Sequence, residues 1–172
     1  MANPGVDIDG LDATRRIFEL FQQRIDTWTR VAPRLHDWTI RRQIDLFRSQ
    51  GRSEGVAWAG YQAEPKYKAF KQAVLGDLTV LRWKGGKRER LYPSLVDKRN
   101  PEHVYQVGSN AVVMGSKVPY ADRLQRGGKN QFGESAPGRP IAIMGDRSRA
   151  KLAQLLAVYI ARGEARGNQW ER

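Results

Sequence analysis

The sequence contains no cysteine, and among its 172 residues only His36 and His103 carry an imidazole. Without cysteine there is no disulfide bond, thiolate nucleophile, iron–sulfur cluster or cysteine-ligated zinc. The two histidines do not stand at a metal-ligand spacing, and no cluster of carboxylates is typical of a two-metal nuclease. We therefore predict neither a metal site nor a cofactor.

Long apolar runs are also missing. The longest uninterrupted one, residues 155–161, is far shorter than the roughly 20 residues that a membrane-spanning helix needs. The N-terminal MANPGVDIDG has neither a basic start nor an apolar segment, so we expect no secretory signal. The sequence therefore predicts a protein with no membrane partner.

Enzyme signatures are nearly absent. No G-x-G pair occurs, which excludes the dinucleotide fingerprint, and the Gly-Gly-Lys triplets at Gly85 and Gly127 lack the rest of a P-loop. The segment Gly51–Gly55 fits G-x-S-x-G, but a nucleophile elbow needs a strand before the serine and a helix after it. Here a helical pattern precedes Ser53 and a loop follows. We therefore predict no catalytic residue, and an enzyme is the least favoured class.

Positive charge is what the sequence has in excess. It carries 30 Lys and Arg against 18 Asp and Glu, a net charge of +12. Residues 81–100 and residues 115–151 each have a balance of +5, and both segments contain the Gly and Pro of loops. This pattern favours a loop surface that faces a polyanion, either nucleic acid or an acidic protein ring. The alternative is a solvated basic face that only aids solubility.

Two stretches in the N-terminal half have the pattern of amphipathic helices. Their apolar residues recur at three- and four-residue spacing. These residues are Ile17, Leu20, Phe21, Ile25 and Trp28 in the first stretch, and Leu35, Trp38, Ile40, Ile44 and Phe47 in the second. Asp9 or Asp12 can cap the first helix, and Pro33 suits the first turn of the second. Gly51 is a natural end for the second helix.

The middle of the chain predicts a loop, a short helix and a hairpin. Residues 52–65 have no helical stripe and read as a long loop anchored by Trp58. Residues 66–75 fit a short helix. Residues 78–83 and 90–92 are predicted to pair as strands across a two-glycine turn.

The remaining pattern predicts a second hairpin from residues 103–107 and 111–114, and then a final helix that Asp146 caps and Gly163 ends. One face of that helix holds Leu152, Leu155, Leu156, Tyr159 and Ile160. The order of elements predicts an α+β fold. It has two N-terminal helices, a small, mainly antiparallel β-sheet of hairpins with long loops, and a C-terminal helix packed on the sheet.

The chain length and the end composition predict one domain with two appendages. Residues 1–10 are expected to form an N-terminal arm, residues 11–163 the domain, and residues 164–172 a C-terminal tail. The tail is polar except for Trp170.

The first hairpin is the candidate contact surface. Aromatic residues at helical or strand spacing are expected in the core, but basic residues surround Trp83. We expect the hairpin to project from the sheet, with the Gly85-Gly86 turn at its tip, and to contact DNA or an acidic partner. Its basic residues are Arg82, Lys84, Lys87, Arg88 and Arg90.

Short motifs follow one another in the second half of the chain. They are Val107-Gly108-Ser109-Asn110, then Val118-Pro119-Tyr120-Ala121, then Gly138-Arg139-Pro140-Ile141. Residues 53–59 and 91–95 fit the same order upstream. Together, over residues 33–162, these motifs resemble the virion morphogenesis, or tail completion, family of tailed bacteriophages. The histidine that this family places after the Tyr-Ala pair is absent here, where Asp122 follows.

The resemblance implies a structural virion protein in a ring at the head–tail junction, as a tail terminator or neck connector. It implies a hexamer, or else a dodecamer, in contact with neck, connector and tail tube proteins and with DNA in the lumen. The family has no known catalytic residue. The motif residues with implied structural roles are Trp58, Gly108, Pro119, Tyr120, Ala121, Arg139 and Pro140. We expect Tyr120 to be mostly buried with its hydroxyl hydrogen-bonded. A free nucleic-acid-binding protein stays open as the alternative.

Overall fold

The computed structural model describes residues 11–58, 65–75, 90–109, 111–129 and 135–163. The predicted arm and tail lie outside the described residues. The same holds for the strand at 78–83 and for the cations Arg82, Lys84, Lys87 and Arg88 of the predicted hairpin.

The described residues form helices, two short 3-10 turns and short strands in an α+β arrangement, as predicted. The helices are α1 (Leu11–Asp26), α2 (Ala32–Arg48), α3 (Pro65–Leu75), α4 (Leu91–Val96), α5 (Ala121–Arg126) and α6 (Asp146–Arg162), and the 3-10 turns are η1 (Trp28–Arg30) and η2 (Arg52–Glu54). The strands are β1 (His103–Val107), β2 (Val112–Ser116), β3 (Gly128–Lys129) and β4 (Ser135–Ala136). No helix in the described part of the chain has the length and apolar character that crossing a membrane requires.

The strands form two antiparallel pairs. In the β1–β2 hairpin His103 faces Ser116 and Val107 faces Val112, so the predicted second hairpin is confirmed. The β3–β4 pair is one that the polar, Gly-rich sequence around it did not indicate.

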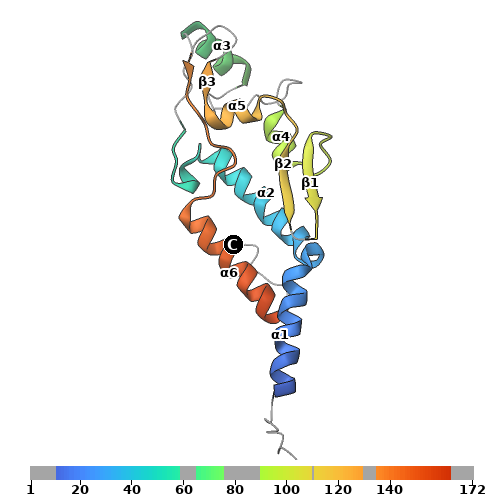
Figure 1. The fold of residues 1–172 in the computed structure, drawn as a ribbon. Coiled ribbons are helices and arrows are strands. Elements are labelled where there is room, and N and C mark those ends of the chain that lie inside the picture. The colour runs from blue at the N-terminus through green and yellow to red at the C-terminus, as the bar shows by residue number, and fades with distance from the viewer. Residues whose placement is uncertain (1–10, 59–64, 76–89, 110, 130–134, 164–172) are drawn as a thin grey trace, which may run out of the picture.

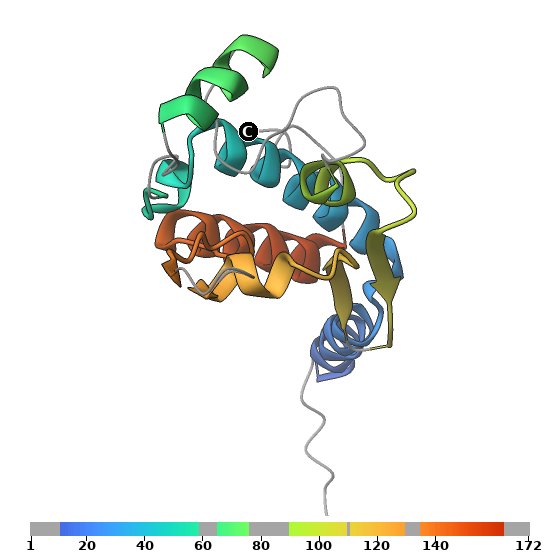
Figure 2. The same cartoon turned by 90° about the horizontal axis from the view of Figure 1, so that it is seen from above.

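Helix α1 extends away from the body of the fold, and α3 lies at the opposite end (Figure 1). Helices α2 and α6 run side by side in both views, and α4 with the β1–β2 hairpin flanks α2 (Figures 1 and 2). The body is therefore built around α2, which packs against α4, α6 and both 3-10 turns.

The first hydrophobic cluster joins α2 to α6. Val31, Leu35 and Trp38 pack there with Leu155 and Tyr159, and all five side chains are buried. The Tyr159 hydroxyl donates a hydrogen bond to the carbonyl of Thr27 at 3.1 Å. The predicted face of the last helix is therefore confirmed. That face packs largely on α2, and the sheet reaches the same cluster through Met114 of β2.

The second cluster joins the far end of α2 to the motif segments. It contains Leu46, Phe47, Trp58, Leu91, Val118 and Ile141. Trp58 anchors its loop as predicted, because its indole packs edge-on against Phe47 and its Nε1 donates to the carbonyl of Pro140 at 3.1 Å.

The prediction of a strand at 90–92 is wrong, because α4 begins at Leu91. Leu91 and Ser94 stand one helical turn apart, and both are buried. The Ser94 hydroxyl donates to the carbonyl of Leu91 at 2.6 Å, and Pro93 lies in the first turn, where its missing N–H costs no hydrogen bond. The two buried residues therefore lie on one face of a short helix. Six residues are too few for a helical repeat to be recognised in the sequence.

One predicted helix boundary is wrong, because the N-cap of α6 is Gly145 and Asp146 is the first helical residue. Of the two candidate caps of the first helix, Asp12 lies inside α1, which begins at Leu11, and Asp9 lies outside the described residues. By contrast, Pro33 is in the first turn of α2 as predicted, and Gly163 ends α6 with a left-handed φ of 68°.

Candidate assembly interface

The predicted apolar stripe of α1 is largely exposed to solvent. The exposed fraction is 51% for Ile17, 66% for Phe18, 47% for Leu20 and 45% for Ile25. Helical spacing places these side chains on one half of the helix, and the other half is polar. An isolated apolar residue on a surface needs no explanation, but a row of exposed apolar side chains along one side of a helix marks a candidate contact surface.

One arginine fastens α1 to the body. Nη1 of Arg24 donates hydrogen bonds to the carbonyls of Ile160 and Ala161 at 2.7 and 2.8 Å. Those carbonyls belong to the last turn of α6, where a cation also compensates the helix dipole. A Cβ on Gly163 would come within 3.0 Å of the Arg24 guanidinium, so the absence of a side chain at Gly163 leaves room for the arginine.

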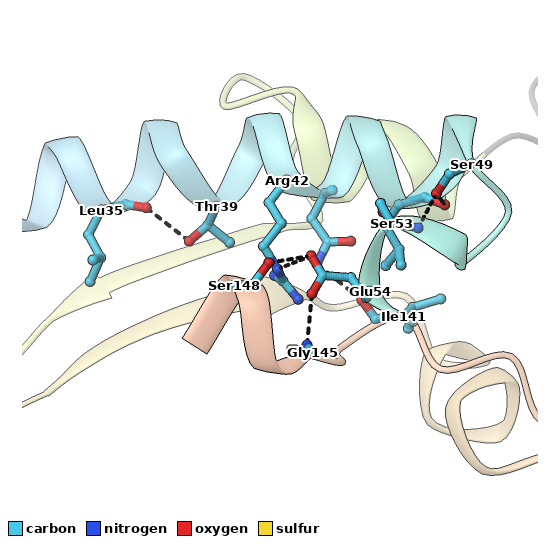
Figure 3. A network of polar contacts seen from close by, with 11 residues as sticks. Leu35, Thr39, Arg42, Ser49, Ser53, Glu54, Ile141, Gly145 and Ser148 are labelled. Atoms are coloured by element: carbon cyan, nitrogen blue, oxygen red, sulfur yellow. Dashed lines mark hydrogen bonds and ion pairs between the residues drawn. The ribbon is translucent and has the colours of Figure 1, made fainter. Parts of the chain in front are cut away.

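A buried ion pair holds α2, η2 and α6 together (Figure 3). Nε of Arg42 lies 2.8 Å from Oε1 of Glu54, and the two side chains are 9% and 2% exposed. Oε2 of Glu54 accepts the N–H of Gly145, and Oε1 accepts the hydroxyl of Ser148, both at 2.8 Å. Burial lowers the pKa of Arg42, and Glu54 opposes that shift. Glu54 thus caps α6 from a distant part of the chain, which is the role that the sequence assigned to Asp146.

The two histidines meet, although no spacing in the sequence relates them. Nε2 of His36 on α2 and Nε2 of His103 on β1 are 2.6 Å apart. Nδ1 of His103 donates to the carbonyl of Ser94 at 2.7 Å, so in the neutral pair His103 accepts at Nε2 and His36 donates. The ring of Tyr105 stacks on His36 with centroids 4.0 Å apart. Burial first, and then the charges of His103 and Lys98, lower the pKa of His36, and Asp37 opposes them.

An apolar cavity of about 250 Å³ lies beside this histidine pair. It is bounded by α2, β2, α5 and the segment around Ile141. Gln43 lines it with a side chain that is 6% exposed. Nε2 of Gln43 donates to the carbonyl of Ile141 at 3.0 Å, while its Oε1 is buried with no hydrogen-bond partner among the described residues.

The motif residues that the sequence singled out converge near the second cluster. Trp58 bonds the carbonyl of Pro140, and the N–H of Arg139 donates to the carbonyl of Leu124 at 2.7 Å. Burial lowers the pKa of the half-buried Arg139. These contacts tie the loop before α6 to the loop after η2 and to α5.

The remaining motif residues lie at turns. The N–H of Ala121 donates to the carbonyl of Val118 at 3.0 Å, and the N–H of Gly108 donates to that of Ala111 at 2.7 Å. Pro119 is exposed. Tyr120 is largely covered and packs against the second cluster, and its hydroxyl is hydrogen-bonded to the backbone at Leu91 and Arg90, as expected. Burial raises its phenolic pKa, and these hydrogen bonds oppose the shift.

Arg90 is the one basic residue of the predicted hairpin that the described residues include. It lies just before α4, its side chain is 49% exposed, and it forms an ion pair with Glu102.

The exposed serine of the G-x-S-x-G segment, Ser53, lies in η2, so the strand–serine–helix arrangement of a hydrolase is not formed there. Among the described residues, no group of three or more His, Asp or Glu is arranged to hold a metal ion.

Comparison of the chain with protein-family models, with curated proteins and with solved structures finds no match, so what the site can do follows from the chain's own residues.

Sequence reasoning missed the cavity, the histidine pair and the buried contacts of Glu54 with Arg42, Gly145 and Ser148. His36 stands one turn before Ile40 on the predicted stripe of α2, which is a signal that it faces the interior. The partner could not be found in the same way, because a contact between residues 36 and 103 exists only once α4 has placed β1 against α2.

Proposed function

We propose that the chain is a structural virion protein of a tailed phage, which forms an oligomeric ring at the head–tail junction. As a tail completion protein, tail terminator or neck connector, it would join the tail to the head and surround the DNA path. Its partners would be further copies of itself, in a hexamer or a dodecamer, and the neighbouring neck, connector and tail tube proteins. It would assemble in the host cytoplasm and end in the virion.

The exposed apolar face of α1 carries this proposal. Burying the exposed parts of Ile17, Phe18, Leu20 and Ile25 against a partner would favour association by about 1 kcal/mol for each side chain. A helix that binds a lipid surface usually has a cationic polar face. On α1, Arg15 already pairs with Glu19 at 3.0 Å, so the polar face is mixed in charge and suits a protein partner.

Self-association also fits the distribution of charge. Copies with a net charge of +12 repel one another, and the mixed polar face of α1 is a place where they can approach. A head-to-tail contact uses two different patches on each copy, and a closed ring satisfies both patches of every copy. The exposed cations Lys117, Arg123, Lys129 and Arg147 could then face DNA or an acidic ring, whereas Arg126 and Arg149 pair with Asp122 and Asp146.

Sedimentation velocity of the full chain tests the proposal. The wild-type protein is expected as one closed oligomer, and Phe18→Ser combined with Ile25→Ser is expected as a monomer. Gln23→Ser, on the polar side of the same helix, is the matched control and should sediment like the wild type. A wild-type monomer at all concentrations would overturn the ring.

The alternative, a free nucleic-acid-binding protein, is favoured by the exposed cations Lys117, Arg123, Arg126 and Lys129. It is separated from the ring by titrating the monomeric double variant with duplex DNA at several salt concentrations. Tight binding by the monomer, with an affinity that falls steeply with salt, would favour the alternative.

A further inference from the structure

We propose that a pocket lined by three arginines, between α1 and the C-terminal end of α6, binds a phosphoryl group. The arginines are Arg24, Arg30 and Arg162, and we call the site the arginine pocket. All three belong to one chain, so the proposal does not rest on the ring. It assigns a class of ligand to cations that have no part in the proposed function.

Hydrogen bonds fix the two walls of the arginine pocket where α1 meets α6 (Figure 1). Leu20, Gln23 and Arg24 lie about one turn apart on α1 and form one wall. The Tyr159 hydroxyl ties the opposite wall to the carbonyl of Thr27, and Nη1 of Arg24 ties it to the last turn of α6. A ligand therefore meets a preformed pocket.

Arg24 keeps part of its guanidinium for a ligand. Its Nη1 donates to two carbonyls of α6. Its Nε and Nη2 have no hydrogen-bond partner among the described residues. These two atoms form one edge of the guanidinium, the arrangement that can bind two oxygens of the same anion.

No carboxylate of the described residues lines the arginine pocket. Arg30 and Arg162 are exposed, and neither has an ion-pair partner in the described part of the chain. The two acidic residues in the C-terminal half of α1, Glu19 and Asp26, already bind other side chains. Three like charges therefore face one pocket, and an anion bound there relieves their repulsion.

The number of arginines favours a phosphoryl group over a carboxylate. A carboxylate has a single charge and two oxygens, which one guanidinium edge can satisfy. A phosphate monoester carries a charge of about −1.5 to −2 and three strong acceptor oxygens, so it matches several arginines at once. The pocket volume of about 240 Å³ is below the ~300 Å³ at which pockets for drug-sized ligands begin, so it takes the phosphoryl group alone.

Isothermal titration calorimetry of the full chain with inorganic phosphate tests the arginine pocket. We expect saturable binding of one phosphate per chain, and binding of acetate that is weaker by about tenfold or more. Acetate is the control for charge alone, because it offers a carboxylate in place of the phosphoryl oxygens.

A double variant removes the two exposed cations and leaves the Arg24 anchor in place. With Arg30→Gln and Arg162→Gln together, the phosphate affinity should fall by about tenfold or more. The matched control is Arg48→Gln with Arg52→Gln. These two arginines also lie in the last turn of a helix and in a 3-10 turn, but outside the pocket. The control should stay within about threefold of the wild type, because exposed charges outside the pocket interact weakly.

The phosphoryl group can come from the DNA backbone or from a free phosphate ester. Titration of both double variants with a short DNA duplex separates these sources. A larger loss of duplex affinity in the pocket variant than in its control assigns the pocket to the DNA backbone. Equal losses, together with intact binding of phosphate by the wild type, assign it to a free phosphate ester.

The competing occupant is a carboxylate of the chain itself, because Glu164 directly follows Gly163. We expect Glu164→Gln to leave the phosphate affinity within about threefold of the wild type. A gain of about tenfold would assign the pocket to that carboxylate and overturn the proposal.

Any of three further results would refute the arginine pocket. They are no saturable binding of phosphate, equal phosphate affinities in the pocket variant and its control, and binding of acetate as tight as that of phosphate. Phe18→Ser with Ile25→Ser, the variant expected to be monomeric, should bind phosphate like the wild type, since neither residue lines the pocket. Failure of the phosphate site is therefore separate from failure of the ring.

Discussion

Glu54 is a single residue on which three elements depend. Glu54→Gln leaves Arg42 buried beside a neutral amide, so we expect a loss of about 3–5 kcal/mol in the free energy of unfolding. Asp146→Asn is the matched control at the same helix N-terminus, where an exposed carboxylate contributes about 0.3–1 kcal/mol. Urea denaturation followed by circular dichroism measures both. Equal losses of unfolding free energy in the two variants would contradict a stabilising role for the buried contacts of Glu54.

His36 makes stability depend on pH. Its folded pKa is below the ordinary value of 6.5, so near that pH the unfolded chain binds the proton more strongly than the folded chain does. The free energy of unfolding therefore falls as the pH drops through 6.5, by at most about 1.4 kcal/mol per pH unit for one proton. Urea titrations at pH 7.5, 6.5 and 5.5 should show this slope in the wild type and a flatter one in His36→Gln. If the wild type and His36→Gln show the same dependence of unfolding free energy on pH, groups other than His36 cause it.

At the scale of elements, the sequence was most informative where periodicity is long. The stripes of α2 and α6 and the second hairpin could be predicted, because their apolar residues repeat over enough positions to define a face. Helix α4 could not, because its burial is set by contacts with Phe47 and Val118 that lie far away in the chain. Helix α1 was predicted from its stripe, yet the stripe does not indicate that four of its apolar side chains are left exposed in the described part of the chain.

The candidate site divides in the same way. Trp58 and Pro140 were singled out separately as motif residues, and the hydrogen bond between them is a tertiary contact. The cavity could not be predicted at all, because Gln43 and Gln125 are ordinary polar residues in the sequence. Their roles appear only when the segment at Ile141 lies across both helices.

At the scale of the whole molecule, the positive charge is expected to act in assembly. Under the proposed function, replacing Lys84, Lys87 and Arg88 together by Glu should strongly reduce the joining of tails to heads, because it reverses the charge that would be offered to DNA or to an acidic ring. Replacing them by Gln is the milder control and should have an intermediate effect. Particle yields counted by electron microscopy measure the result. Normal particle yields with the Glu variant would show that these three cations only face solvent and take no part in assembly.

The Arg24 anchor has a geometric consequence. From Arg24 to Leu11 the helix runs about 20 Å, with its near end tied to the last carbonyls of α6. A turn of about 10° at this pivot moves the far end of α1 by about 3.5 Å, while the core between α2 and α6 stays in place. The body and the helix can therefore meet a neighbour at slightly different inclinations. In the proposed ring, such a lever would let the same subunit close rings of different circumference without repacking its interior.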